Sequence, residues 1–174
     1  MTPLWPSALF LAFLVAQRLA ELAIARRNTA RLIARGAMEH GAEHYPVMVG
    51  MHAAWIVCLV VFGLGNPVSL PWLALFAVLQ LGRVWVLATL GERWTTRIVV
   101  LDKPLVAKGP FRLIPHPNYT VVVAEIVVAP MVLGLVWVAV LFTVLNAAML
   151  WVRIRAEERA LAPLRRTPEG QGAL

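Results

Sequence analysis

The segment Gly109-Pro-Phe-Arg-Leu-Ile-Pro-His-Pro-Asn-Tyr119 is polar, contains three prolines, and lies between two strongly apolar regions. Its start, Lys108-Gly109-Pro110, cannot continue a helix, whereas Pro117 suits the first turn of a new one. A helix beginning near Pro117 would direct His116 and Tyr119 toward one patch beside its N-terminus. Unpaired backbone N–H groups at such an end favour anions such as a carboxylate. The segment therefore predicts a binding site at a helix start.

The composition of the chain excludes an ordinary soluble protein. Of its 174 residues, 60% are hydrophobic and seven are Trp, which is typical of an integral membrane protein. The lone Cys58 lies in an apolar run, so neither a disulfide framework nor a thiolate metal site is expected. The sequence thus predicts an all-α integral membrane protein.

The apolar runs predict five membrane-spanning helices. A span needs about 20 apolar residues, and the region 119–151 is too long for one span. Pro130 and Gly134 lie near its middle, so we expect a hairpin of two shorter helices, with a single bent helix as the alternative. The predicted spans are 4–25, 46–64, 70–90, 119–133 and 134–151, in a single domain of residues 1–162 followed by a disordered tail, 163–174.

The distribution of charge predicts the orientation of these spans. Fourteen of the sixteen Lys and Arg residues fall in the segments that five spans would place on one side of the membrane, and none falls in the segments of the other side. Because cytoplasmic segments collect Lys and Arg, we expect the N-terminus outside and the C-terminus in the cytosol. This asymmetry explains the net charge of +7 without a nucleic-acid partner. The basic segments are 26–45, 91–118 and 152–174.

Polar residues inside the spans form a second signal. Helical rise places them about 6 to 12 Å from the cytosolic ends of their spans, so they are expected to form one layer. Burial of such groups in a membrane is costly, and a layer on one side favours a pocket that opens to the cytosol over a channel. The alternative is that these groups pair with one another to hold the helices together. The layer consists of Arg18, Glu21, His52, Arg83, Glu125 and Asn146.

Two segments next to the spans have patterns of their own. Residues 97–101 and 105–107 flank Asp102-Lys-Pro104, which predicts a short β-hairpin-like segment near the membrane surface that covers a site. After the fifth span, residues 153–161 read as a charged continuation of the helix, in which Arg153 and Glu157 are i,i+4 neighbours.

Taken together, these motifs resemble the isoprenylcysteine carboxyl methyltransferase family of membrane enzymes. The resemblance rests on the Gly109-Pro-Phe-Arg112 and His116-Pro-Asn-Tyr119 pieces, an apolar hairpin, and the Arg153 to Leu161 segment. Upstream pieces, Arg26-Arg27-Asn28, 39–46 and 90–98, are similar to a bacterial branch whose members accompany type III polyketide synthases and O-methylate phenolic or pyrone lipids. Such a protein is expected in the bacterial plasma membrane, with its active site facing the cytosol.

The resemblance implies S-adenosylmethionine as the methyl donor and a lipophilic acceptor that enters from the bilayer. It implies that His116, Tyr119 and Pro117 lie at the cofactor and that the backbone from Leu113 to Pro115 holds its adenosine end. Two positions depart from the family pattern: Pro115 replaces a common Arg, and Val121 replaces a common Gly. The catalytic residues implied are Arg153, Glu157 and His116, with Glu158 as the alternative carboxylate at the cofactor.

The sequence leaves the acceptor open. A carboxylate acceptor is ionised at neutral pH and needs no base, whereas a phenol, with a pKa near 10, would benefit from one. Candidate bases are His116, His52, Glu157, His40 and His44. A metal is not expected, since the i,i+4 pair His40 and His44 lacks a third ligand. The alternative of another class is a non-catalytic membrane scaffold or transporter subunit.

Overall fold

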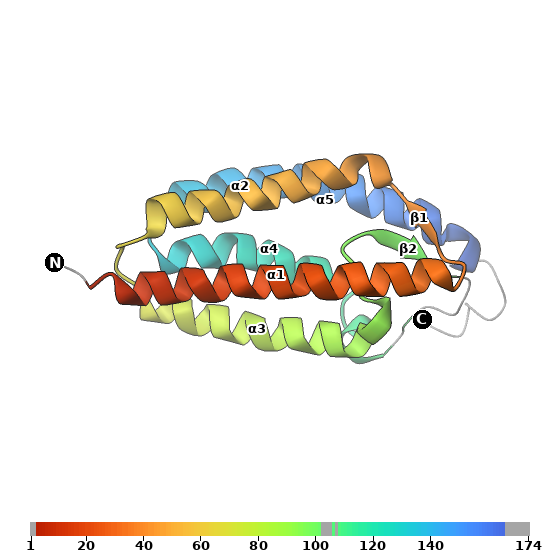
Figure 1. Cartoon of the computed structure of the whole chain (residues 1–174), viewed down its shortest axis with the longest axis horizontal. Coiled ribbons are helices and arrows are strands. Elements are labelled where there is room, and N and C mark those ends of the chain that lie inside the picture. Colours follow the sequence, from red (N-terminus) through yellow and green to blue (C-terminus); the bar gives the residue numbers. More distant parts are fainter. Residues whose placement is uncertain (1–2, 102–105, 107, 166–174) are drawn as a thin grey trace.

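The computed structural model describes residues 3–101, 106 and 108–165, and the side chains of this set up to residue 162. Within these residues the chain forms five α-helices, two short strands and three short 3-10 helices (Figure 1). The α-helices are α1 (Trp5–Ala34), α2 (Tyr45–Gly63), α3 (Leu70–Leu90), α4 (Pro117–Val132) and α5 (Val136–Arg165). The strands are β1 (Met38–His40) and β2 (Ile98–Val100), and the 3-10 helices are η1 (Ala42–His44), η2 (Gly91–Arg93) and η3 (Gly109–Arg112).

Four of the helices, α1, α2, α3 and α5, are long and apolar enough to cross a membrane, and α4 is a shorter apolar helix. The 16 residues of α4 extend about 24 Å at the rise of an α-helix. This helix packs between α3 and α5 and buries residues mainly in its second half, including Ile126, Ala129 and Val132. The all-α membrane fold and its five helices are therefore as the sequence predicts, with the shortest helix enclosed by its neighbours.

The predicted hairpin in the region 119–151 is also present. Helix α4 ends at Val132 and α5 begins at Val136, which excludes one bent helix. Gly134 has a φ of +69° in the turn, and the N–H groups of Leu133, Gly134 and Leu135 donate to carbonyls of the last turn of α4. A glycine adopts this left-handed backbone conformation at little cost, and the resulting turn terminates α4.

Two helices continue beyond the predicted span boundaries. Helix α1 extends to Ala34, nine residues past the predicted end at Ala25, before Gly36 with a φ of +88° lets the chain turn. Helix α5 continues through the predicted charged extension to Arg165, so residues 163–165 are helical although a disordered tail was expected there. Arg, Ala, Leu and Glu, which are good helix formers, dominate both extensions. The rest of the predicted tail, 166–174, lies outside the described residues.

The first strand of the predicted β-hairpin is present, but it pairs with a different segment of the chain from the one predicted. Residues 98–100 form a strand, but β2 pairs antiparallel with β1, with Glu39 opposite Val99. Leu101 and Val106 are not in a strand, and the rest of the predicted turn and second strand, 102–105 and 107, lies outside the described residues. An ion pair between Arg97 and Glu39, with an N–O distance of 2.7 Å, joins the two segments. Pairing between segments 60 residues apart has no local sequence signal.

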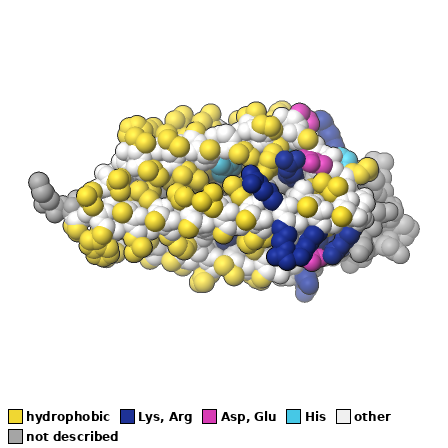
Figure 2. Space-filling view, viewed as in Figure 1, with side chains coloured by type: hydrophobic (Ala, Val, Ile, Leu, Met, Phe, Trp, Pro, Cys, Tyr) yellow, Lys and Arg dark blue, Asp and Glu magenta, His cyan; other side chains and the backbone are white. Residues whose placement is uncertain are grey.

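The two ends of the bundle differ in character. A hydrophobic core runs through the half that contains the α2–α3 and α4–α5 turns, and it includes Leu14, Trp55, Leu59 and Val138. Lys and Arg side chains gather at the other end, where α1 ends and α2 begins (Figure 2). We call this second region, which also holds β1, β2 and the start of α4, the basic end.

Candidate functional site

The start of α4 at the basic end has the form expected of a binding site. His116 precedes the helix and makes no side-chain cap, and Pro117 occupies its first turn. The first backbone bond of the helix runs from the Thr120 N–H to the His116 carbonyl, at 3.1 Å. The N–H groups of Asn118 and Tyr119 precede this bond, so they have no partner within the helix. The His116 and Tyr119 rings stack with centroids 5.5 Å apart, so the two side chains share one patch.

Tyr119 connects this helix start to α5. Its hydroxyl donates to the Glu157 carboxylate and accepts from Nε of Arg153 at 3.0 Å. The Arg153 guanidinium also lies 5.8 Å from the centre of the Tyr119 ring. Predicted site residues from distant positions in the sequence therefore form one cluster, which consists of His116, Tyr119, Arg153 and Glu157.

Arg153 is held by groups that carry no negative charge. Its side chain is buried, with the residue 7% exposed, and its Nη1 and Nη2 donate to the Met48 sulfur at 2.8 Å and the Thr96 carbonyl at 2.6 Å. Among the residues that the structure describes, it forms no ion pair within 4.0 Å. A buried cation with only neutral acceptors is well suited to hold an anionic group of a ligand.

The loop that contacts Arg153 is anchored from α2 and β1. Tyr45 and Thr96 form a hydroxyl–hydroxyl bond of 3.0 Å, and the Arg97 guanidinium lies 4.4 Å from the centre of the Tyr45 ring. The hydrogen bond to Glu39 raises the pKa of Arg97. The small sheet thus fixes the Thr96 carbonyl. Sequence reasoning missed Met48, Thr96 and Tyr45, because their roles arise from contacts between distant segments.

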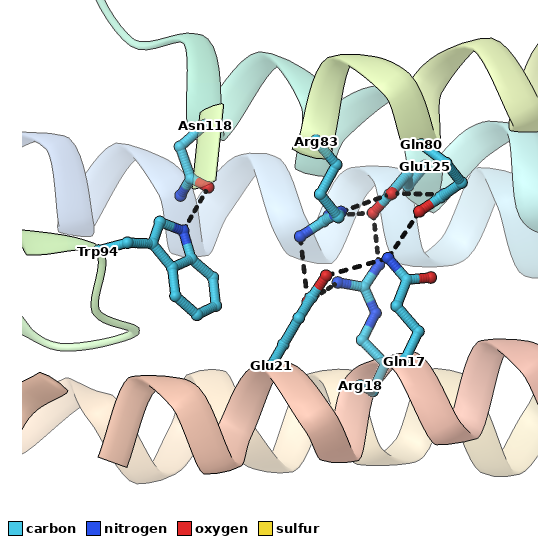
Figure 3. A network of polar contacts seen from close by, with 8 residues as sticks. All are labelled: Gln17, Arg18, Glu21, Gln80, Arg83, Trp94, Asn118 and Glu125. Atoms are coloured by element: carbon cyan, nitrogen blue, oxygen red, sulfur yellow. Dashed lines mark hydrogen bonds and ion pairs between the residues drawn. The ribbon is translucent and has the colours of Figure 1, made fainter. Parts of the chain in front are cut away.

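A second anchor reaches the start of α4 from α1. The Trp94 indole donates to the Asn118 side-chain oxygen at 3.2 Å (Figure 3). Asn28 of α1 donates in turn to the Trp94 carbonyl at 2.8 Å. These bonds connect the α1 extension, the loop after α3 and the first turn of α4. The α1 extension therefore positions the site.

Deeper in the bundle, four of the predicted layer residues form a buried polar network (Figure 3). Arg83 donates to Glu125 through Nε at 2.7 Å and to Glu21 at 3.1 Å. Arg18 pairs with the same two carboxylates. Two cations and two anions balance, so the network provides the compensation that ions in an apolar bundle require. For these four residues the structure supports helix pairing over a ligand pocket.

Two amides complete the network. Gln17 donates to Gln80 at 2.6 Å, and Gln80 donates to Glu125 at 2.9 Å. Sequence reasoning missed both residues, although an amide inside an apolar span was an available signal.

The other two predicted layer residues make no contact in this network. His52 bonds to the Met48 carbonyl at 2.9 Å, and Asn146 is buried on α5.

The remaining predicted site residues lie around the cluster. Leu113 and Pro115 are exposed in the segment before α4, and Pro117 is buried at the start of that helix. Of the two candidate carboxylates, Glu157 contacts Tyr119, whereas Glu158 is exposed. Within the described part of the chain, no group of three or more His, Cys, Asp or Glu side chains is placed to hold a metal.

The fold defines a membrane-embedded helical bundle with a polar cluster, a candidate binding site, where its fourth and fifth helices reach the basic end. Residues 72–163, more than half of the chain, match the model of the isoprenylcysteine carboxyl methyltransferase (ICMT) family. The chain belongs to this family, which makes it an integral membrane protein of a methyltransferase class.

Two relatives cover nearly the whole chain. It is 40% identical over 159 residues to the uncharacterized protein YpbQ of Bacillus subtilis, covering 88% of this chain and 95% of the relative. It is 26% identical over 163 residues to an uncharacterized protein of Haemophilus influenzae, covering 88% and 93% of the two chains. No solved structure matches. The names of these relatives assign neither an activity nor an acceptor.

Proposed function

We propose that the protein is an S-adenosylmethionine-dependent O-methyltransferase that acts on a lipophilic acceptor at the cytosolic side of a bacterial plasma membrane. A phenolic or pyrone lipid is the preferred acceptor. The observation that carries the proposal is the cluster of Tyr119, Arg153 and Glu157 beside the open N-terminus of α4. This polar site lies in a bundle whose other surfaces expose mainly apolar side chains, so an acceptor dissolved in the bilayer has access to the protein.

The residues of the cluster fit the chemical groups of the proposed methyl donor. The backbone N–H groups at the start of α4 suit its carboxylate, and the stacked rings of His116 and Tyr119 suit its flat adenine. The negative Glu157 carboxylate suits the positive ammonium or sulfonium group of the donor. The exposed backbone from Leu113 to Pro115 lies next to this patch. When bound, the donor supplies a methyl group activated by a good leaving group.

The protein would mainly contribute alignment and exclusion of water. Tyr119 fixes the Glu157 carboxylate, because its hydroxyl also accepts a bond from Arg153. Arg153 is in turn held by Thr96 and Met48 from two other segments. A displacement at a methyl group needs its reactants in line and poorly hydrated, and rigid side chains in an apolar bundle supply both conditions.

One observation favours the alternative, methylation of an isoprenylcysteine-type carboxylate. Arg153 has only neutral acceptors among the described residues, so its charge could hold an acceptor carboxylate. Pro115 stands where the family commonly has an Arg, which removes a second cation from this region and supports the phenolic or pyrone acceptor. A non-catalytic scaffold or transporter subunit would not account for membership of a methyltransferase family.

Calorimetric titration of the purified protein in detergent with S-adenosylmethionine tests this proposal. We expect saturable binding that Glu157→Gln weakens about 10-fold or more, because hydrogen bonds to charged groups contribute about 1.5–3 kcal/mol. Glu43→Gln makes the same chemical change at an exposed position of η1 and should bind like the unmodified protein. Absence of binding in folded protein, both in detergent and in lipid, would refute the proposal.

A further inference from the structure

His52 lies between the Tyr119–Arg153–Glu157 cluster and the buried ion network, and its hydrogen bond to the backbone defines which ring nitrogen carries the proton. His52 lies on the inner face of α2, which also carries Met48, Trp55 and Leu59 at helical spacing. Its Nδ1 lies 2.9 Å from the Met48 carbonyl oxygen. A carbonyl oxygen can only accept, so Nδ1 carries the proton of this bond. In the neutral ring the other nitrogen, Nε2, therefore presents a lone pair, and it has no hydrogen-bond partner among the described residues.

Three arginines from neighbouring helices lie near His52. Arg18 of α1, Arg83 of α3 and Arg153 of α5 all act on it electrostatically. The first two are balanced by Glu21 and Glu125 in the buried network, whereas Arg153 has neutral partners. No carboxylate contacts the imidazole within the described residues. A neutral imidazole whose Nε2 has no partner can accept a proton at that nitrogen.

The position of His52 is on the membrane side of the candidate site. Met48 contacts Arg153 through its sulfur and His52 through its carbonyl. His52 lies one turn further along α2, about 6 Å deeper along the helix axis. A lipid acceptor approaching Arg153 from the bundle interior would meet this side chain. His52 is therefore connected through Met48 to the candidate site and lies on its membrane side.

The other candidate bases are engaged elsewhere. Glu157 accepts the Tyr119 hydroxyl proton in a hydrogen bond, and His116 stacks on Tyr119 at the helix start. His40 lies in β1 and His44 in η1, both before α2. Of the four histidines, all of which the structure describes, His52 alone lies within one of the five α-helices.

We infer that His52 is the general base for an acceptor with an acidic hydroxyl group, a phenol or an enol, rather than a carboxylate. This inference rests on the proposed methyltransferase function. The acceptor O–H bond breaks, and its proton passes to Nε2 of His52. The oxygen electron pair forms a C–O bond to the methyl group of a sulfonium donor as the C–S bond breaks. The products are a methyl ether, a neutral thioether and an imidazolium that later releases its proton to water.

The test compares two histidine variants and two acceptor probes. The probes are 5-pentadecylresorcinol, which is a phenol, and N-acetyl-S-farnesylcysteine, which is a carboxylic acid. With the phenol, His52→Gln should lower kcat about 100-fold or more, since a general base contributes about 10²–10⁴-fold. His44→Gln should keep the rate. The wild-type rate should fall at acidic pH, where the imidazole is protonated, and His52→Gln should lose this dependence.

A spectroscopic readout separates proton transfer from turnover. An alkylated nitrophenol bound to the protein should show more of the coloured phenolate than the same probe with His52→Gln, and calorimetry should show unchanged donor binding in the variant. Retention of the phenol rate and pH profile by His52→Gln overturns the inference, as does a wild-type protein that methylates only the carboxylic acid. Both results leave the methyltransferase proposal intact, whereas absence of donor binding refutes that proposal itself.

Discussion

At the scale of single residues, Glu125 shows how ions are tolerated inside this bundle. The residue is fully buried, and its carboxylate accepts hydrogen bonds from Arg18, Arg83 and Gln80. Each of these partners lies on α1 or α3, so the carboxylate connects three helices. Removal of one member of a buried ion network leaves the others uncompensated in an apolar medium. The stability of the bundle should therefore depend on this side chain.

We expect Glu125→Gln to destabilise the folded protein by about 3–5 kcal/mol, because two buried guanidinium groups would then share the single carboxylate of Glu21. The measurement is the unfolding transition in detergent micelles, followed by circular dichroism. Glu92→Gln is the matched control. Glu92 pairs with Arg31 and Arg35 at the surface, where ion pairs contribute little. An unchanged transition for Glu125→Gln would contradict the role assigned to the network.

At the scale of elements, the connection between α4 and α5 directs both helices of the candidate site. Tyr119 lies on α4 and Arg153 and Glu157 on α5, so their contact depends on how the hairpin closes at the far end of the bundle. Gly134 closes it with a left-handed backbone, and a Cβ added there would meet no atom within 4 Å. The cost of a side chain at this position would therefore be conformational rather than steric.

Two glycine-to-alanine substitutions should change stability in opposite directions. Gly134→Ala should destabilise the protein by about 1–2 kcal/mol, the cost of the left-handed conformation for a residue with a Cβ. Gly50→Ala lies inside α2, where a Cβ also meets nothing, and should stabilise the protein by about 0.5–1 kcal/mol. Thermal unfolding of the two variants beside the wild type measures both effects. Equal shifts of the same sign would show that the backbone of Gly134 is not left-handed.

At the scale of the whole molecule, charge distinguishes the two ends of the bundle. The basic end carries the candidate site, whereas the opposite end presents mainly apolar side chains around the α2–α3 and α4–α5 turns (Figure 2). If Lys and Arg mark the cytosolic side, the site opens to the compartment in which S-adenosylmethionine is made. The orientation of the protein is therefore part of its proposed function.

Cysteine labelling in cells tests this orientation. In a Cys58→Ser background, Pro67→Cys in the exposed α2–α3 connection should react with a membrane-impermeant maleimide in intact spheroplasts. Glu43→Cys in η1, at the basic end, should react only after the membrane is permeabilised. The reverse pattern would place the candidate site outside the cell.

Most of the fold could be predicted because its signals are local. Helix α3 begins and ends at the predicted residues, Leu70 and Leu90, since Pro71 marks its start and Gly91 its end. The α4–α5 hairpin followed from Pro130 and Gly134. Pairing of β2 with β1 was not predictable, since it depends on where the ends of α1 and α3 meet. The extension of α1 was missed because an apolar run marks only the part of a helix that lies in the membrane. It carries no information on whether the helix continues into water.

The residues of the candidate cluster were predicted from the sequence, but their contacts were not. His116, Tyr119, Arg153 and Glu157 were predicted because they lie in polar segments of an apolar chain and because these segments resemble the family's motifs. Met48 and Thr96 were missed, because one contributes a sulfur and the other a backbone carbonyl, and neither group is visible as a chemical motif. The choice of Glu157 over Glu158 likewise required the position of Tyr119.

The sequence alone determined the class of molecule. Its apolar runs, its charge asymmetry and its Pro and Gly residues act over short distances, so they specify the helices, the membrane spans and the segment at the start of α4. Only the tertiary structure decided which polar groups meet. Arg18, Glu21, Arg83 and Glu125 balance one another's charge, whereas His52 remains outside that network. The reason is physical: the cost of a buried charge depends on its neighbours in space, and the order of residues along the chain does not specify them.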